Sequence, residues 1–163
     1  MRPDITAYRP CVGIMLLNKN NQAWIGRRFE KQNDDGIGKW WQMPQGGIDE
    51  GEDLQAAALR ELYEETGVTQ ASLIEESRRW FTYDLPDLLI GKSWGGKYRG
   101  QKQKWFAMRF TGQDSDIKLI VPGQKQEFDE WQWAKMSVVL DLIIPFKRNV
   151  YVELLKDFAH LGS

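Results

Sequence analysis

Residues 46–68 read G-G-I-D-E-G-E-D-L-Q-A-A-A-L-R-E-L-Y-E-E-T-G-V, and this stretch decides how the chain folds. Its alanine- and leucine-rich centre predicts a helix from about Asp53 to Thr66, and Gly67 supplies the C-terminal stop. Three apolar side chains fall on one side of that helix: Leu59, Leu62 and Tyr63. We expect this side to pack on a sheet and the opposite side to stay available for polar chemistry.

The opposite side of the predicted helix carries three glutamates. Glu61, Glu64 and Glu65 fall within an arc of about 100°, and like charges at this spacing repel by about 0.2–0.5 kcal/mol per pair. Such a cluster is either a solvated helix face or a site for a hard divalent cation. Mg²⁺ fits the second interpretation because it takes oxygen ligands and retains waters for phosphate substrates.

Charge is segregated along the chain although the net charge is only −1. Residues 46–65 hold seven acidic side chains and one basic, a net charge of −6, whereas residues 78–109 hold eight basic and two acidic, a net charge of +6. This asymmetry indicates either two solvated faces or two functional surfaces, one attracting cations and one attracting anions.

The composition is that of one ordinary domain spanning residues 1–163. The chain is 42% hydrophobic and 12% aromatic, which supplies one sizeable core and rules out disorder for the bulk of it. Cys11 is the only cysteine and His160 the only histidine, so a disulfide framework is excluded and a histidine-rich metal site is not expected. We expect Cys11 to pack in the core and His160 to lie on the surface. No secretion signal or membrane span is visible, which predicts a cytoplasmic protein without membrane contact.

The remaining sequence predicts an α/β fold. Apolar runs and alternating segments predict strands at residues 11–17, 23–28, 72–83, 102–111 and 131–134, with an extended piece at 40–44. The tail from about residue 137 to 161 is predicted to be helical, with an interruption at Pro145. Strands flanked by helices on two sides indicate an α/β/α sandwich around a mixed sheet.

The acidic stretch also matches a known pattern, the Nudix box, G-x5-E-x7-R-E-U-x-E-E-x-G-U with U apolar. Every specified position is filled: Gly46, Glu52, Arg60, Glu61, Leu62, Glu64, Glu65, Gly67 and Val68. A chance match has a probability below about 10⁻⁹ per starting point. The chain therefore resembles the Nudix hydrolases, which implies a loop–helix–loop that holds divalent metal and hydrolyses a nucleoside diphosphate linked to another group.

The resemblance implies roles for individual residues. The metal-binding and catalytic carboxylates would be Glu61, Glu64 and Glu65, with Mg²⁺ as the cofactor and Mn²⁺ or Zn²⁺ as substitutes. Glu127, in a polar loop outside the box, is implied as a further carboxylate that binds metal or takes a proton from water, against the alternative of a solvated loop acid. Four residues would support the box: Gly46, Glu52, Arg60 and Gly67.

Segments outside the box narrow the resemblance. Tyr8-Arg9-Pro10, Trp41 to Ile48, Gly100 to Phe106 and Phe146-Lys147-Arg148 are similar to the bacterial RNA 5′-pyrophosphohydrolases and to the diadenosine tetraphosphate hydrolases. The loop Glu30 to Lys39 is longer than in the enterobacterial RNA enzymes, so 5′-triphosphorylated RNA and a dinucleoside polyphosphate both stay open as substrates. A non-catalytic nucleotide- or RNA-binding module is a third alternative, although a pure binder needs no repulsive glutamate cluster. The expected assembly is a monomer or weak oligomer.

The expected substrate-binding residues are basic or aromatic: Arg9, Arg28, Tyr83, Lys102, Lys104, Phe146 and Lys147. Arg28 and Phe146 can sandwich a base, because exposed RNA bases stack on guanidinium and aromatic planes, unless Phe146 is a core residue. On a strand, Lys102 and Lys104 share one face and can meet a triphosphate, unless they are edge-strand lysines that discourage aggregation. Two loop tryptophans are expected near the pocket: Trp40 and Trp94.

Overall fold

Two long strands, paired in parallel, form the centre of the sheet. The computed structural model describes residues 7–28, 40–86 and 97–161. In it, β1 (Tyr8–Leu17) runs beside β7 (Gly100–Phe110), with Tyr8 opposite Gly100 and Leu17 opposite Arg109. The predicted strand over residues 11–17 is buried throughout, as expected of a strand covered on both faces, and begins earlier than predicted.

Four shorter strands pair antiparallel with the central ones and two more pair antiparallel with β2, so the described residues form one eight-stranded mixed sheet. The order is β3-β2-β1-β7-β5, while β4 pairs with β1, β6 with β7 and β8 with β2. Their bounds are β2 Ala23–Arg28, β3 Trp41–Gln42, β4 Gln45–Gly47, β5 Ala71–Glu76, β6 Phe81–Asp84 and β8 Phe128–Ala134. β4 and β2 pair with different halves of β1, so the stretch that enters the box lies directly against the central strand.

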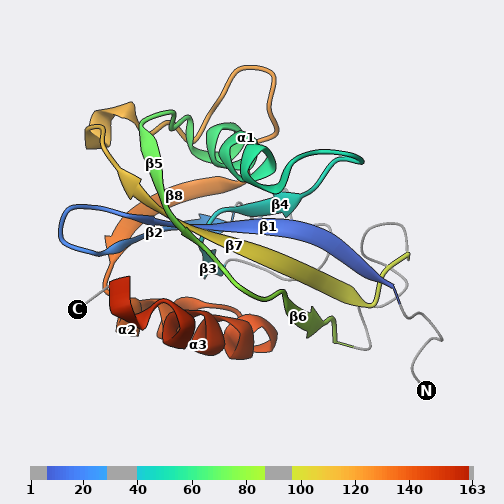
Figure 1. The fold of residues 1–163 in the computed structure, drawn as a ribbon. Coiled ribbons are helices and arrows are strands. Elements are labelled where there is room, and N and C mark those ends of the chain that lie inside the picture. The colour runs from blue at the N-terminus through green and yellow to red at the C-terminus, as the bar shows by residue number, and fades with distance from the viewer. Residues whose placement is uncertain (1–6, 29–39, 87–96, 162–163) are drawn as a thin grey trace.

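The helices cover both faces of the sheet. Helix α1 (Leu54–Thr66) lies on one face, whereas α2 (Met136–Leu142) and α3 (Arg148–Asp157) lie on the other (Figure 1). The predicted interruption at Pro145 is confirmed by a short 3₁₀ turn, Pro145–Lys147; two more such turns span Asp114–Asp116 and Ala159–Leu161. The α/β/α sandwich predicted from the sequence is confirmed.

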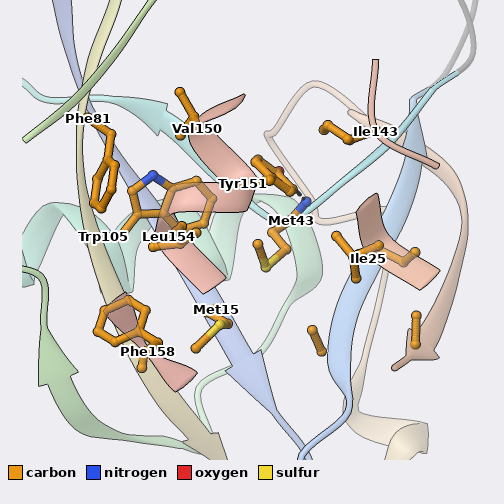
Figure 2. Packing of buried hydrophobic residues seen from close by; sticks show 14 of the residues in the cluster. Met15, Ile25, Met43, Phe81, Trp105, Ile143, Val150, Tyr151, Leu154 and Phe158 are labelled. Atoms are coloured by element: carbon orange, nitrogen blue, oxygen red, sulfur yellow. Dashed lines mark hydrogen bonds between the residues drawn. The ribbon is translucent and has the colours of Figure 1, made fainter. Parts of the chain in front are cut away.

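Alternate side chains of the central strands enter two separate hydrophobic cores. On the α1 face the buried cluster includes Val12, Ile14, Leu62 and Phe106. On the α3 face it includes Met15, Trp105, Tyr151 and Leu154, and Figure 2 shows the Trp105 indole close to Tyr151. The two rings meet edge to face, with centroids 5.6 Å apart, a geometry that aromatic pairs favour.

The prediction of one strand over residues 72–83 is wrong, because the chain makes a turn inside that segment. β5 ends at Glu76 and β6 begins at Phe81. Between them, Ser77 Oγ accepts a hydrogen bond from the Trp105 N–H (3.0 Å) and donates to the Arg79 carbonyl (2.9 Å). The serine hydroxyl thus replaces a regular ladder bond and stabilises the turn.

Helix α1 is also rotated relative to the prediction. Leu59 and Tyr63, expected to pack on the sheet, are 41% and 44% exposed, and of the three apolar residues only Leu62 is buried. Ala57 and Ala58 face the sheet instead, and Glu65 is buried beside them at 6% exposure. Two alanines let the helix approach closely, which turns one of the three glutamates inward.

A single phenol tests the packing on the α3 face. The Tyr151 hydroxyl accepts a hydrogen bond from the Met43 backbone N–H (3.0 Å), drawn as a dashed line in Figure 2. Tyr151→Phe keeps the ring but leaves this buried N–H unsatisfied, so we expect unfolding in denaturant to show a loss of about 1–3 kcal/mol. Tyr63→Phe, at an exposed position, is the control and should change nothing. Equal stability of both variants would contradict the assigned hydrogen bond.

Candidate active site

The Arg60 guanidinium joins the loop before α1 to the helix itself. Its Nε donates to Glu52 Oε2 (2.8 Å), and Nη2 donates to Glu52 Oε1 (2.9 Å) and to the Gly47 carbonyl (2.9 Å). Its Nη1 donates to Glu61 Oε1 (2.8 Å) and to Glu64 Oε2 (3.1 Å). Only a planar fork with five N–H donors reaches this many acceptors, which lysine does not offer.

Glu52 lies in the same network, as expected of a residue that supports the box. Besides the two bonds from Arg60, it accepts a hydrogen bond from the Asp49 backbone N–H (3.0 Å). The hydrogen bonds from Arg60 and then from Asp49 lower the pKa of Glu52 from its ordinary 4.5 to about 2. Glu52 is therefore ionised at neutral pH and holds the loop against the helix.

Glu61 extends from α1 toward the strand that enters the box. Its carboxylate lies against Gly46, where a β-carbon would overlap it, so the glycine provides the space that the carboxylate occupies. Burial raises the pKa of Glu61 to about 7, although the hydrogen bond from Arg60 opposes the shift. The site thus holds a partly desolvated acid whose charge needs compensation.

Glu65 is the most deeply buried carboxyl of the group. Its Oε1 accepts a hydrogen bond from the Gln45 backbone N–H (3.1 Å). Burial raises its pKa well above the ordinary value, and the nearby charges of Glu127 and Glu61 raise it further. The structure therefore brings Glu127, from the loop before β8, into electrostatic contact with the helix glutamates.

The donor set fits a hard divalent cation. Four carboxyl groups could supply oxygen ligands, and their mutual repulsion is compensated only in part by Arg60. Within the described ranges, no group of three or more such side chains is already arranged as a metal centre. Arg60 binds the carboxylates of Glu61 and Glu64, and an ion would compete with it for them.

Basic side chains lie next to these carboxylates, around Cys11. The thiol is fully buried, as predicted, and burial raises its pKa to about 11. Arg9 and Lys147 lower that pKa and Glu61 raises it, so all three charges act on the same thiol. Arg9 Nη1 also donates to Cys11 Sγ (3.7 Å), and the Arg9 guanidinium lies against Gly47, next to the Gly46 that Glu61 contacts. The structure thus brings Arg9, a predicted substrate-binding residue, close to the acidic helix.

Tyr83 and Phe146 form the aromatic part of the same group of side chains. Their ring centroids are 5.7 Å apart, and the Lys147 Nζ lies 5.6 Å from the Tyr83 ring centre. The Lys147 ammonium also donates to Gln42 Oε1 (3.1 Å) and is almost fully buried. Burial raises the pKa of the Tyr83 hydroxyl, and the charges of Arg28 and Arg9 oppose that rise.

Lys102 and Lys104 are not part of this group of side chains. They alternate along β7 with Gln101, Gln103 and Trp105, which are buried on the α3 side, so the two lysines project to the α1 side. Their ammonium groups lie over the Trp80 ring, 5.3 and 5.9 Å from its centre.

The buried glutamines were missed by the sequence analysis. Gln103 Nε2 donates to Gln45 Oε1 (3.0 Å) and to Gln101 Oε1 (2.8 Å), and Gln103 Oε1 accepts from the Trp105 indole (3.0 Å). Together with Gln42, which accepts from Lys147, they form a row of hydrogen-bonded amides. The signal was present in the alternation Gln-Lys-Gln-Lys of residues 101–104, which puts two amides on one face and two ammonium groups on the other.

Comparison with known proteins agrees with the geometry. The model of the NUDIX domain family matches residues 7–154. The chain belongs to the Nudix family. Relatives of this Nudix protein in Brucella ovis and Brucella anthropi, both named RNA pyrophosphohydrolase, are each 53% identical to it. The alignments cover 99% and 98% of this chain and 93% and 94% of the relatives.

Solved structures show the same fold at low identity. An Ap4A hydrolase binary complex from C. elegans superposes with a TM-score of 0.65 at 19% identity and covers 94% of this chain and 96% of its own. A MutT protein from Methanosarcina mazei Go1 has a TM-score of 0.63 at 18% identity, covering 93% and 95%. At these identities the likeness concerns the Nudix fold alone.

Three further expectations concern single residues or segments. His160 is exposed, as predicted, and its Nε2 lies 2.8 Å from Glu75 Oε1. Trp40 is 36% exposed just before β3. Trp94 lies outside the described residues, as does the loop Glu30 to Lys39.

Among the helices in the described part of the chain, none has the length and apolar character to cross a membrane.

The depressed pKa of Glu52 predicts a pH dependence of stability. The ion pair with Arg60 stabilises the fold above the ordinary carboxyl range and is lost as the pH falls from about 4.5 toward about 2. Without added metal, Glu52→Gln should therefore lower the melting temperature at pH 7, and the gap to the parent chain should close in acid. Glu50→Gln, in the same loop, should match the parent throughout. A gap that stays constant with pH would contradict the assigned ion pair.

Proposed function

We propose that this Nudix protein removes pyrophosphate from the 5′-triphosphate end of RNA and leaves a 5′-monophosphate, a step that initiates mRNA decay. The observation that carries the proposal is that the Arg9 guanidinium lies against Gly47 while the Glu61 carboxylate lies against the neighbouring Gly46. Lys147, Tyr83 and Phe146 lie together on the other side of Cys11's strand, and with Arg9 they would form the substrate pocket. A triphosphate needs cations on both sides, and a terminal base needs an aromatic face. The names of the 53% identical relatives support the same activity.

The four carboxylates would serve as metal ligands and as the proton acceptor for the attacking water. A divalent cation held by Glu61, Glu64 and Glu65 would neutralise phosphate oxygens and acidify a water that attacks phosphorus. Glu127 lies outside the helix, and its charge raises the pKa of Glu65. Because Arg60 does not bind it, Glu127 suits the role of proton acceptor or additional ligand. Arg60 keeps Glu61 and Glu64 oriented while Glu52 anchors it from the other side.

The pocket residues would bind the RNA end. Arg9 and Lys147 supply positive charge for the phosphates, and the buried position of Lys147 favours a strong, weakly screened interaction. Phe146, whose ring lies beside Tyr83, would stack on the first base, with the Arg28 guanidinium on the other face of that base. A base presented by a free single-stranded end fits this arrangement.

A dinucleoside polyphosphate is the second candidate substrate. The features that favour RNA, two cations for phosphates and an aromatic face for a base, are also those that diadenosine tetraphosphate requires. The discriminating experiment incubates the protein with Mg²⁺ and compares kcat/KM for triphosphorylated RNA and for diadenosine tetraphosphate. The proposal expects RNA to be the better substrate, and a preference for the dinucleotide would replace it with the second candidate.

The metal role of Glu65 is tested by an isosteric change. Glu65→Gln keeps the side-chain volume and removes the charge, so we expect kcat to fall by orders of magnitude while the circular dichroism spectrum is unchanged. Glu50→Gln on the exposed loop is the matched control and should keep full activity. Turnover close to that of the parent chain in Glu65→Gln would remove this residue from the metal site.

The stacking role of Phe146 predicts a difference between substrates. Loss of one stacking partner typically costs about 1–3 kcal/mol, or roughly 5- to 150-fold in kcat/KM. Phe146→Ala should therefore impair triphosphorylated RNA more than a free nucleoside triphosphate. Because Phe146 also packs against the α3-side core, Phe146→Leu serves as a control that keeps apolar volume. If both variants lose melting temperature and every activity alike, Phe146 is a core residue and the stacking role is wrong.

A further inference from the structure

An exposed tryptophan lies among cations on the face of the sheet that carries α1. Trp80 is 39% exposed, and the Lys102 and Lys104 ammonium groups lie 5.3 and 5.9 Å from its ring centre. Thr82, two residues on, is exposed and sits directly opposite Lys102 in the β6–β7 pair. We define the Trp80 patch by four residues that share this surface: Trp80, Thr82, Lys102 and Lys104.

The Trp80 patch carries excess positive charge. Arg78 is exposed, and its backbone carbonyl accepts a hydrogen bond from Lys104 Nζ (3.3 Å). Glu76 lies 3.7 Å from the same ammonium and compensates one charge. Lys102 contacts the Trp80 ring and forms no ion pair with a carboxylate in the described part of the chain. An aromatic face bordered by two ammonium groups and one acid is complementary to a polyanion that carries flat rings.

The patch is close to the proposed active site but separate from it. Lys102 lies opposite Pro10 across the β1–β7 pair, and the Pro10 carbonyl accepts a hydrogen bond from the Ile48 N–H of the box (3.1 Å). Neighbouring strands are about 5 Å apart, so only a few strand widths separate the box from Trp80. Figure 1 shows β6 at the end of the sheet where β1 begins.

We propose that the Trp80 patch binds the single-stranded RNA that follows the 5′ end held in the pocket, with a base stacked on Trp80 and backbone phosphates at Lys102 and Lys104. The inference rests on the proposed function, because it assumes an RNA substrate. Proteins that track single strands combine such stacking platforms with a basic surface. It gives the two lysines a role on the body of the RNA instead of on its terminal phosphates.

Binding without turnover tests the patch directly. The probe is a fluorescent single-stranded RNA of about 12 nucleotides with a 5′-hydroxyl, which lacks the triphosphate that the pocket would hold. Trp80→Ala should weaken its binding roughly 5- to 150-fold, and Trp80→Phe should restore most of it. Lys102→Ala should reduce the slope of the logarithm of the binding constant against the logarithm of salt concentration by about 0.7. Lys19→Ala makes the same charge change in the β1–β2 hairpin and should leave that slope at the value of the parent chain. Unchanged binding in Trp80→Ala would overturn the proposal.

Turnover separates this proposal from the proposed function. Trp80→Ala should lower kcat/KM for a long triphosphorylated RNA and leave a triphosphorylated dinucleotide unaffected. An equal loss on both substrates, at unchanged melting temperature, would mean that the patch serves the terminal phosphates and would overturn the inference. If the parent chain releases no pyrophosphate from RNA, the proposed function fails, while binding of the 5′-hydroxyl probe still decides whether the patch holds RNA.

Discussion

The Arg60 guanidinium is the interaction on which the candidate site depends. One planar group binds Glu52 in the loop before α1, the Gly47 carbonyl in β4, and Glu61 and Glu64 on the helix. The loop and the helix therefore keep one relative position. Because α1 packs on the sheet through Ala57, Ala58 and Leu62, the contacts that close the core also fix the direction of the carboxylates.

Arg60 alone does not balance the acidic charge that it organises. Glu65 is buried against the Gln45 N–H, near Glu61 and Glu127, and burial together with these neighbouring charges raises its pKa. Burying several like charges costs free energy of folding, and a bound cation would offset that cost. The residues that strain the fold are therefore the same ones that the expected chemistry uses. Arg9 and Lys147, both near Cys11, supply the positive charge that a phosphate chain beside the acidic helix would need.

The sequence predicted the sandwich, the helix with its end at Gly67, and the box, because fixed spacing and strong propensities determine these features locally. It did not predict the rotation of α1, which depends on how closely Ala57 and Ala58 approach the sheet. Nor did it predict the turn at Ser77, whose hydroxyl bonds to a strand far away in sequence. The alternation of residues 101–104 puts the glutamines and the lysines on opposite faces of the strand. Only the packing of α3 shows which face is which, with the glutamines on the side of Tyr83.

The most direct test of this account is the effect of Mg²⁺ on thermal unfolding. A cation that binds the folded carboxylates and not the unfolded chain stabilises the fold in proportion to the logarithm of its concentration, once that concentration exceeds the dissociation constant. The account predicts that the melting temperature rises with added Mg²⁺ and stays constant in sodium chloride of equal ionic strength. A melting temperature that responds identically to both salts would contradict the claim that the acidic helix is a metal site.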